Sequence, residues 1–226
     1  TVTGVQTCAL PIWYFKMRKF IAILTALCLM LVPALSLADD VSSSYFWSTD
    51  TEFDLYDLGF SINIPENWTR ADDETIAAMN GEGEDAQAAD DTTDNATALS
   101  PYAIAMMANA DNSASMMIAC EDVEDPEAIV TPDQYIELFA NDLVISSAES
   151  GVTYTYDTTA ISDATLCTQT FREMALSGSD GSIIDLLVCH SGMGTYYSFV
   201  IVGTSDSITP FAQEFVNAVA EIDAVG

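Results

Sequence analysis

Apolar and polar residues alternate along residues 59–65, which is the spacing of a half-buried β-strand that Pro65 ends. A shorter strand is predicted at 52–56 from similar interleaving. Trp68 follows closely, and we expect its ring to cover the core as a lid. Residues 72–79 are predicted to form a short helix.

Two apolar runs, 102–108 and 115–120, flank the turn-forming residues 109–112, which predicts a β-hairpin. A helix is expected to begin at Pro132, because Thr131 can cap its free backbone N–H groups and Gln134 completes a capping box. The apolar stripe of this helix extends to about residue 147.

The last third of the chain predicts more strands and one final helix. The strands are expected at 152–156, 165–176, 182–190 and 195–202. The last two contain runs that are apolar on both faces, as in strands at the middle of a covered sheet. The final helix should carry a stripe from Phe211 to Ile222. These elements predict one α/β domain, a mostly antiparallel sheet flanked by helices, over residues 39–226.

Residues 80–97 contain no apolar side chain larger than alanine, so they cannot bury enough surface to offset the entropy of ordering. We expect a mobile acidic loop. Six carboxylates in it are weak candidates for holding a cation: Glu82, Glu84, Asp85, Asp90, Asp91 and Asp94. Because the ordered spacing of an EF-hand is absent, a solvated loop is the preferred interpretation, and no metal or cofactor is predicted.

The first 38 residues are expected to lie outside the folded domain. Residues 1–16 are interpreted as a non-native leader, since 2–12 resemble a translated sequencing adapter; a genuine extension is the alternative. Residues 17–38 have the basic, apolar and small-residue segments of a signal peptide. Its apolar run is shorter than the roughly 20 residues that span a bilayer. We expect cleavage near Ala38, a secreted or extracytoplasmic protein, and no stable membrane insertion of the mature chain.

Negative charge dominates the composition, with 35 acidic residues against 5 basic ones. Every acidic residue lies after Ala38, where Arg70 and Arg172 are the only basic residues. Such a field repels nucleic-acid phosphates, which excludes nucleic-acid binding, and it attracts cations and basic partners. A surface that serves only solubility is the alternative.

Three cysteines follow Ala38, and their spacing matches no metal site. An odd number leaves at least one thiol unpaired. If the turn after residue 176 is centred on Gly178, Cys167 and Cys189 face each other across a hairpin and could form a disulfide. In a register one residue away, Arg172 could pair with Asp185 instead, so the two pairings compete.

The remaining candidates for chemistry are few. His190 is the only histidine, and it follows Cys189 on a strand, where adjacent side chains point to opposite faces. We therefore expect it to end a strand rather than to catalyse. Asp185 lies within an apolar strand and could be a buried acid with a raised pKa, although an edge position or an ion pair would also explain it. Four methionines are expected to fill the core: Met106, Met107, Met116 and Met117.

The stretch from Gly59 to Trp68 resembles the glycine, aromatic, strand, proline and tryptophan opening of the PsbP, Mog-type and DcrB-like superfamily. The order of the later elements, up to about residue 222, is also similar to the order in that superfamily. This resemblance implies a PsbP-like α/β/α sandwich in an exported bacterial member. Members of the superfamily act by binding or by assisting assembly, and the resemblance implies no shared catalytic residues.

We therefore expect an exported, non-catalytic binding or accessory module, not an enzyme, whose partner is an unidentified protein or a cation. The alternative is a hydrolase that acts on extracellular glycans. Glycosidases need only two carboxylates, and this chain supplies many.

Overall fold

The computed structural model describes residues 41–42, 46–80, 101–122, 131–148, 151–191 and 194–222. The expected leader, the signal peptide and all six cation candidates between residues 82 and 94 lie outside these residues. The same holds for the acidic loop predicted at 80–97, apart from Asn80 at its start. These expectations therefore stay predictions.

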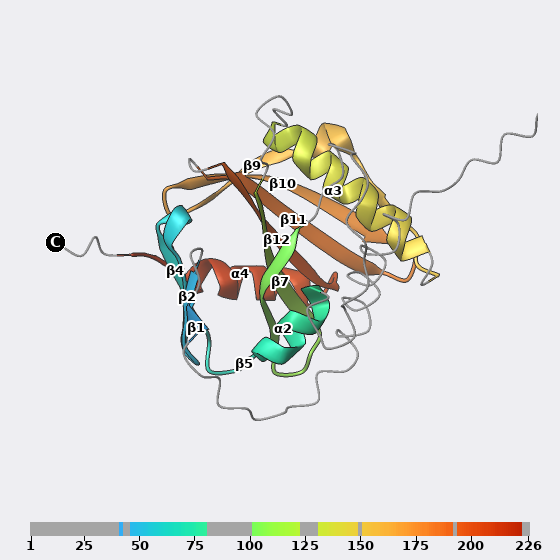
Figure 1. Cartoon of the computed structure of the whole chain (residues 1–226). Helices are drawn as coiled ribbons and strands as arrows, with labels where there is room; N and C mark the ends of the chain where they lie inside the picture. Colours follow the sequence, from blue (N-terminus) through green and yellow to red (C-terminus); the bar gives the residue numbers. More distant parts are fainter. Residues whose placement is uncertain are drawn as a thin grey trace, which may run out of the picture.

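The described residues form a large antiparallel sheet, in the order β5-β6-β7-β12-β11-β10-β8, with β9 also paired to β10 (Figure 1). Its strands are β5 (Trp68–Arg70), β6 (Tyr102–Asn109), β7 (Ala114–Asp122), β8 (Tyr154–Tyr156), β9 (Ser162–Leu166), β10 (Gln169–Gly178), β11 (Ser182–His190) and β12 (Thr195–Thr204). The antiparallel sheet and the hairpin of β6 and β7 are confirmed.

A second, smaller antiparallel sheet has the order β1-β2-β3-β4-β13. Its strands are β1 (Val41–Ser42), β2 (Phe46–Ser48), β3 (Glu52–Leu55), β4 (Phe60–Asn63) and β13 (Val219–Glu221). Strands β3 and β4 match the predicted strands. The separate sheet was not anticipated, because two of its strands are too short to show a periodic pattern and β13 lies at the other end of the chain.

Helices cover both faces of the large sheet. The helices are α2 (Asp73–Asn80), α3 (Pro132–Ser147) and α4 (Ile208–Ala218), with short 3₁₀ turns η1 (Tyr56–Leu58) and η3 (Thr158–Ala160). Helices α2 and α3 pack on one face, whereas α4 packs on the other, between the large and the small sheet (Figure 1). The second face is thus covered by a helix together with a sheet, not by helices alone.

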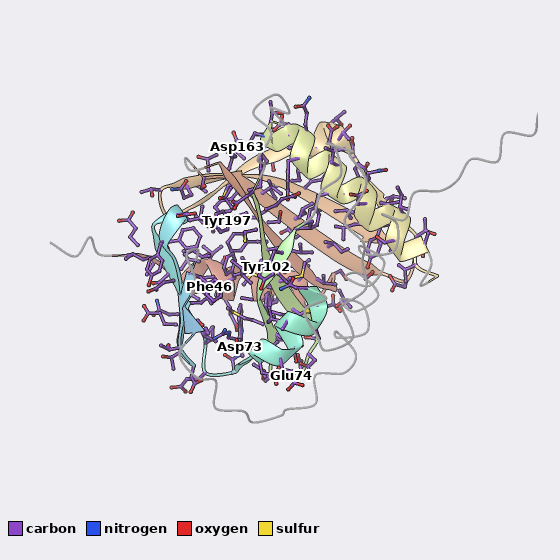
Figure 2. All side chains as sticks on the ribbon, in the orientation of Figure 1. Phe46, Asp73, Glu74, Tyr102, Asp163 and Tyr197 are labelled. Atoms are coloured by element: carbon purple, nitrogen blue, oxygen red, sulfur yellow. The ribbon has the colours of Figure 1, made fainter. Side chains whose placement is uncertain are left out.

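Alternating side chains of β12 supply both cores. Phe199 points toward α4, where its ring centroid is 5.7 Å from that of Phe215, and Val200 points toward α3. The four methionines of the β6–β7 hairpin divide in the same way between the two cores, and each is almost completely buried. Their predicted role as core residues is confirmed. Figure 2 shows Phe46 and Tyr197 enclosed between the sheets, with Asp73, Glu74 and Asp163 on the outside.

Two local predictions are confirmed in detail. The Thr131 hydroxyl accepts a hydrogen bond from the Gln134 backbone N–H at 3.3 Å, and the Gln134 side chain accepts one from the Thr131 N–H at 2.9 Å. This capping box starts α3. Trp68 covers the core, since its ring stacks on Phe211 at 4.1 Å and its Nε1–H donates to Glu214 at 2.8 Å.

The exposed edge of β6 is closed by a side chain. The Asn80 amide donates to the Ala103 carbonyl at 2.9 Å and accepts from the Ala103 N–H at 2.8 Å. Further along the same edge, the Ala71 N–H donates to the Met106 carbonyl at 2.9 Å. Asn80 of α2 and Ala71, which follows β5, therefore satisfy backbone groups that an edge strand would otherwise present to solvent.

Two predicted boundaries are wrong. The strand expected at 165–176 is divided into β9 and β10 by a tight turn in which Cys167 has φ 51°. The final helix ends at Ala218 instead of continuing to Ile222, because residues 219–221 leave it to pair with β4. In both places pairing with a neighbouring strand, which the local pattern does not reveal, decides the outcome.

The predicted registers of the β10–β11 hairpin are also wrong. The Gly181 N–H bonds to the Gly178 carbonyl at 3.0 Å, so the hairpin is centred on Asp180, two residues beyond the position that a disulfide would require. Cys167 and Cys189 are accordingly both free, as is Cys120. In the same register Arg172 pairs with Val188 and Asp185 with Ala175, so the expected ion pair between Arg172 and Asp185 is absent as well.

Alkylation should distinguish the three thiols. Iodoacetamide should modify Cys167 in the folded, unreduced chain, because this residue is exposed, and should reach Cys120 and Cys189 only after unfolding, because both are buried. Peptide mass mapping with and without denaturant measures this, with a reduced sample as the control. A disulfide-linked peptide containing Cys167 and Cys189 would contradict the register.

Candidate functional site

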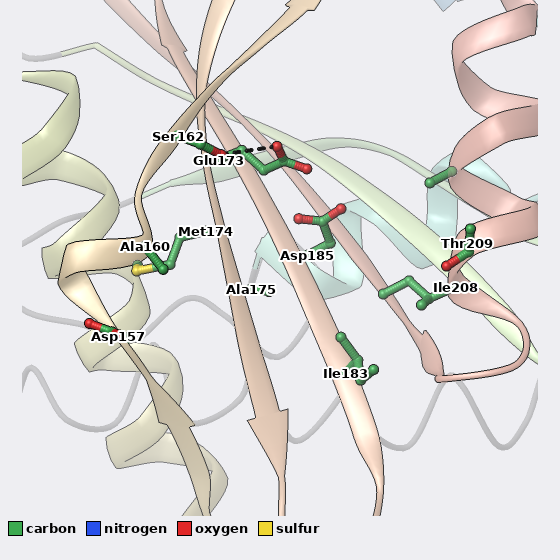
Figure 3. A pocket seen from close by; sticks show the side chains of 11 residues that line it. Asp157, Ala160, Ser162, Glu173, Met174, Ala175, Ile183, Asp185, Ile208 and Thr209 are labelled. Carbon is green, nitrogen blue, oxygen red and sulfur yellow. Dashed lines mark hydrogen bonds between the residues drawn. The ribbon is translucent and has the colours of Figure 1, made fainter.

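A groove opens over β10 and β11 beside the first turn of α4 (Figure 3). Its volume is about 460 Å³. The carboxyl groups of Glu173 and Asp185 lie in the middle of this view, between the η3 connection on one side and α4 on the other. The lining residues are Asp157, Ala160, Ser162, Glu173, Met174, Ala175, Ile183, Asp185, Ile208, Thr209 and Ala212.

Strand alternation places both carboxylates on the face that α4 covers. Phe171 and Leu187, which share this face, belong to the core, and Glu173 and Asp185 follow at the point where the core ends. Glu173 lies directly opposite Leu187 in the register, so Asp185 is its diagonal neighbour on the adjacent strand. Side chains at such diagonal positions can interact, over backbone separations of roughly 7–8 Å.

Asp185 is the most perturbed carboxyl group of the groove. Removal from water and, to a smaller extent, the nearby charge of Glu173 raise its pKa from 3.8 to about 7. Within the described part of the chain, no side chain or backbone group donates a hydrogen bond to it. Glu173 accepts a weak hydrogen bond from the Ser162 hydroxyl at 3.4 Å. Asp185 is thus half-buried, not fully buried as the sequence suggested, and its pKa is raised as expected.

The side of the groove next to α4 is mainly apolar. Ile183 extends the α4-facing row of β11 by one position beyond Asp185, and Ile208 and Ala212 approach from α4. Figure 3 shows Ile183 and Ile208 on the same side of the groove as Asp185. The site thus offers two carboxylates beside aliphatic surface, which suits a ligand that carries a positive charge on an apolar stem.

Arg172, which the sequence suggested as a partner of Asp185, is used elsewhere. Its guanidinium bonds Asp133 in the first turn of α3, with Nε 2.5 Å from Oδ1, and also bonds Asp163 on β9. These contacts attach α3 to the strand pair β9–β10. They also leave Asp185 without a basic neighbour.

Arg70 is likewise occupied within the fold. Its guanidinium lies 5.7 Å above the ring of Phe53, donates to the Thr49 carbonyl at 3.4 Å and lies 3.4 Å from Asp73. Burial lowers its pKa, whereas the charges of Asp73 and Asp50 raise it. Arg70 connects β5 to the turn that precedes β3, and so holds the two sheets together.

His190 and Cys189 do not form a catalytic couple. His190 is exposed at the end of β11, with its ring centroid 4.7 Å from that of Tyr196. Cys189 is buried on the opposite side of the sheet, and burial raises the pKa of its thiol. Cys120 is similar, since burial and nearby carboxylates together raise the pKa of its thiol to about 12. Thiols held protonated in this way are poor nucleophiles.

Reasoning from the sequence singled out Asp185 but missed Glu173 and the groove itself. The signal was an acidic residue at a core-facing position on each of two adjacent strands. This pairing of acidic residues is visible only in the observed register of β10 and β11. The two registers predicted from the sequence placed Cys167 or Arg172 in this region instead.

Two further findings concern the described residues alone. They contain no group of three or more His, Cys, Asp or Glu side chains arranged to hold a metal ion. None of their helices combines the length and the apolar character that crossing a bilayer requires.

Comparison with known proteins shows a weak likeness in structure and none in sequence. No known family matches the sequence, and no curated protein matches it. The structure is similar to the solution structure of cyanobacterial PsbP (CyanoP) from Synechocystis sp. PCC 6803, with a TM-score of 0.47 and 10% sequence identity. The match covers 84% of this chain and 100% of that chain. Because both similarity values are low, this likeness carries no argument about activity or partner.

Replacing Asp185 should change how stability depends on pH. Its folded-state pKa lies above the unfolded-state value, so the folded chain loses stability as the pH rises from about 4 to about 7. Asp185→Asn should therefore raise the free energy of unfolding at about pH 8 by about 1–3 kcal/mol and have little effect near pH 4. Urea unfolding at both pH values measures this.

Glu137→Gln is the control for general relief of charge repulsion, because Glu137 is exposed on α3. A stability difference between Asp185→Asn and the unsubstituted chain that is the same at both pH values would contradict the assignment.

Proposed function

We propose that this chain is a non-catalytic binding module that holds a basic segment of a partner protein. One observation carries the proposal: beyond residue 38 the chain has two basic residues, and both are committed to internal ion pairs. The 35 acidic residues therefore have almost no basic counterpart. Export by a signal peptide at 17–38 and a PsbP-like α/β/α sandwich belong to the same proposal.

The distribution of carboxylates favours an extended partner. Exposed acids lie at positions far apart in the chain, such as Glu66 before β5, Asp111 between β6 and β7, and Asp206 before α4. Like charges spread in this way attract an opposite charge over about 10 Å at moderate ionic strength and speed its association. A lysine- or arginine-rich peptide can contact several of them at once.

Binding of a basic peptide should depend steeply on salt. A fluorescent octalysine peptide should bind the chain at about 20 mM salt and lose most of its affinity at about 500 mM, because salt screens exposed charges. Fluorescence anisotropy measures both values. A peptide with glutamine at each lysine position is the control. Absence of octalysine binding at low salt, or affinity that salt leaves unchanged, would overturn the proposal.

A second candidate function is a hydrolase that acts on glycans. The observation that favours it is Asp185, whose pKa of about 7 lets it hold a proton near neutral pH beside a second carboxyl group, Glu173. A proton donor and a neighbouring carboxylate are the two groups that glycoside hydrolysis requires.

Turnover on a panel of soluble glycans tests this alternative. If it holds, Asp185→Asn and Glu173→Gln should each reduce the rate by about 100-fold or more, whereas Glu137→Gln should not. Product release would be followed by a reducing-sugar assay between pH 5 and pH 8. Inactivity across the panel would reject the hydrolase and leave the binding module.

A further inference from the structure

We infer that the groove beside α4 binds a lysine side chain of the basic partner, with its ammonium between Glu173 and Asp185 and its methylene stem on Ile183 and Ile208. This inference rests on the proposed function and deepens it, because it names the residue type that the partner presents and the place where it binds.

The polar end of the groove fits an ammonium group. Glu173 and Asp185 come from neighbouring strands at diagonal positions, so a compact charge with three donors can contact both. Asp185 is half-buried, and no described residue donates a hydrogen bond to it. A bound ammonium would donate a hydrogen bond to the Asp185 carboxylate and would also balance its negative charge.

The apolar end fits an aliphatic stem. Ile183, Ile208 and Ala212 line the groove next to Asp185, and Ile208 is itself buried against the core. Four methylene groups separate the charge of lysine from its backbone, and such stems bury on apolar surface while the charged end stays at the rim. An inorganic cation would use the carboxylates and gain nothing from these walls.

Binding of lysine should strengthen with pH. The ammonium requires Asp185 to be ionised, so at about pH 6 binding must first displace a proton from it. The other titratable groups that line the groove are Glu173 on β10 and Asp157, whose pKa is lowered by hydrogen bonds from Thr159. Helix α4 contributes Ile208, Thr209 and Ala212, and β12 places Ile201 opposite Asp185, so neither element adds a titrating group there.

The test compares two double variants that remove the same charge. Octalysine affinity at low salt should fall about fivefold or more in Asp185→Asn with Glu173→Gln, and by about twofold or less in Glu74→Gln with Glu137→Gln. The affinity of the unsubstituted chain should rise between about pH 6 and pH 8, and the groove variant should lose this rise. Anisotropy measures affinity, and circular dichroism checks that each variant is folded.

A second measurement needs no variant. In chain labelled at isoleucine methyl groups, octalysine should shift the resonances of Ile183 and Ile208 more than that of Ile136, which lies on the buried face of α3. Equal loss of affinity in both double variants, with unshifted Ile183 and Ile208 methyls, would overturn the inference that lysine binds in the groove. The proposal of a basic partner would then still stand. Equal or stronger binding of octa-arginine at the groove would overturn the choice of lysine. Failure of octalysine to bind anywhere would instead reject the proposed function.

Discussion

The large sheet must bury apolar side chains on both of its faces, because residues 199–202 place Phe, Val, Ile and Val in succession on β12. Phe199 and Ile201 require cover from one side, and Val200 requires it from the other. Helix α4 and the small sheet cover Phe199 and Ile201, and helix α3 covers Val200. Burial of a phenylalanine contributes on the order of 2–3 kcal/mol, so losing either layer would expose more apolar surface than a domain of marginal stability can tolerate.

The local pattern predicted those parts of the fold that depend on nearby residues. The capping box at Thr131, the β6–β7 hairpin and the two-sided burial of β11 and β12 were all visible in the sequence. It could not predict the small sheet, whose β13 pairs with β4 across most of the chain. It also missed the turn at Cys167, because residues 165–170 contain no Gly, Pro, Asn or Asp that would mark a break there.

The groove shows why a site is harder to predict than the strands that form it. Asp185 stood out because an acid is unusual in an apolar strand. Which residue lies beside Asp185 depends on the strand register alone. A shift of the hairpin centre by one or two residues replaces Glu173 by Arg172 there, or brings Cys167 opposite Cys189. A basic neighbour would make Asp185 an ordinary structural ion pair. The acidic neighbour found there leaves Asp185 half-buried without a basic partner, and the hydrolase alternative and the lysine-binding inference both depend on this arrangement.

The amide of Asn80 imitates a peptide group, since it both donates to and accepts from Ala103 as a neighbouring strand would. A second molecule that approached β6 edge to edge would have to displace these two bonds before forming its own. At Ala103, beyond the part of β6 that β5 covers, protection against edge-to-edge stacking therefore comes from one side chain and does not depend on charge. At high ionic strength, where repulsion between carboxylates is screened, the two hydrogen bonds between Asn80 and Ala103 would still block this edge.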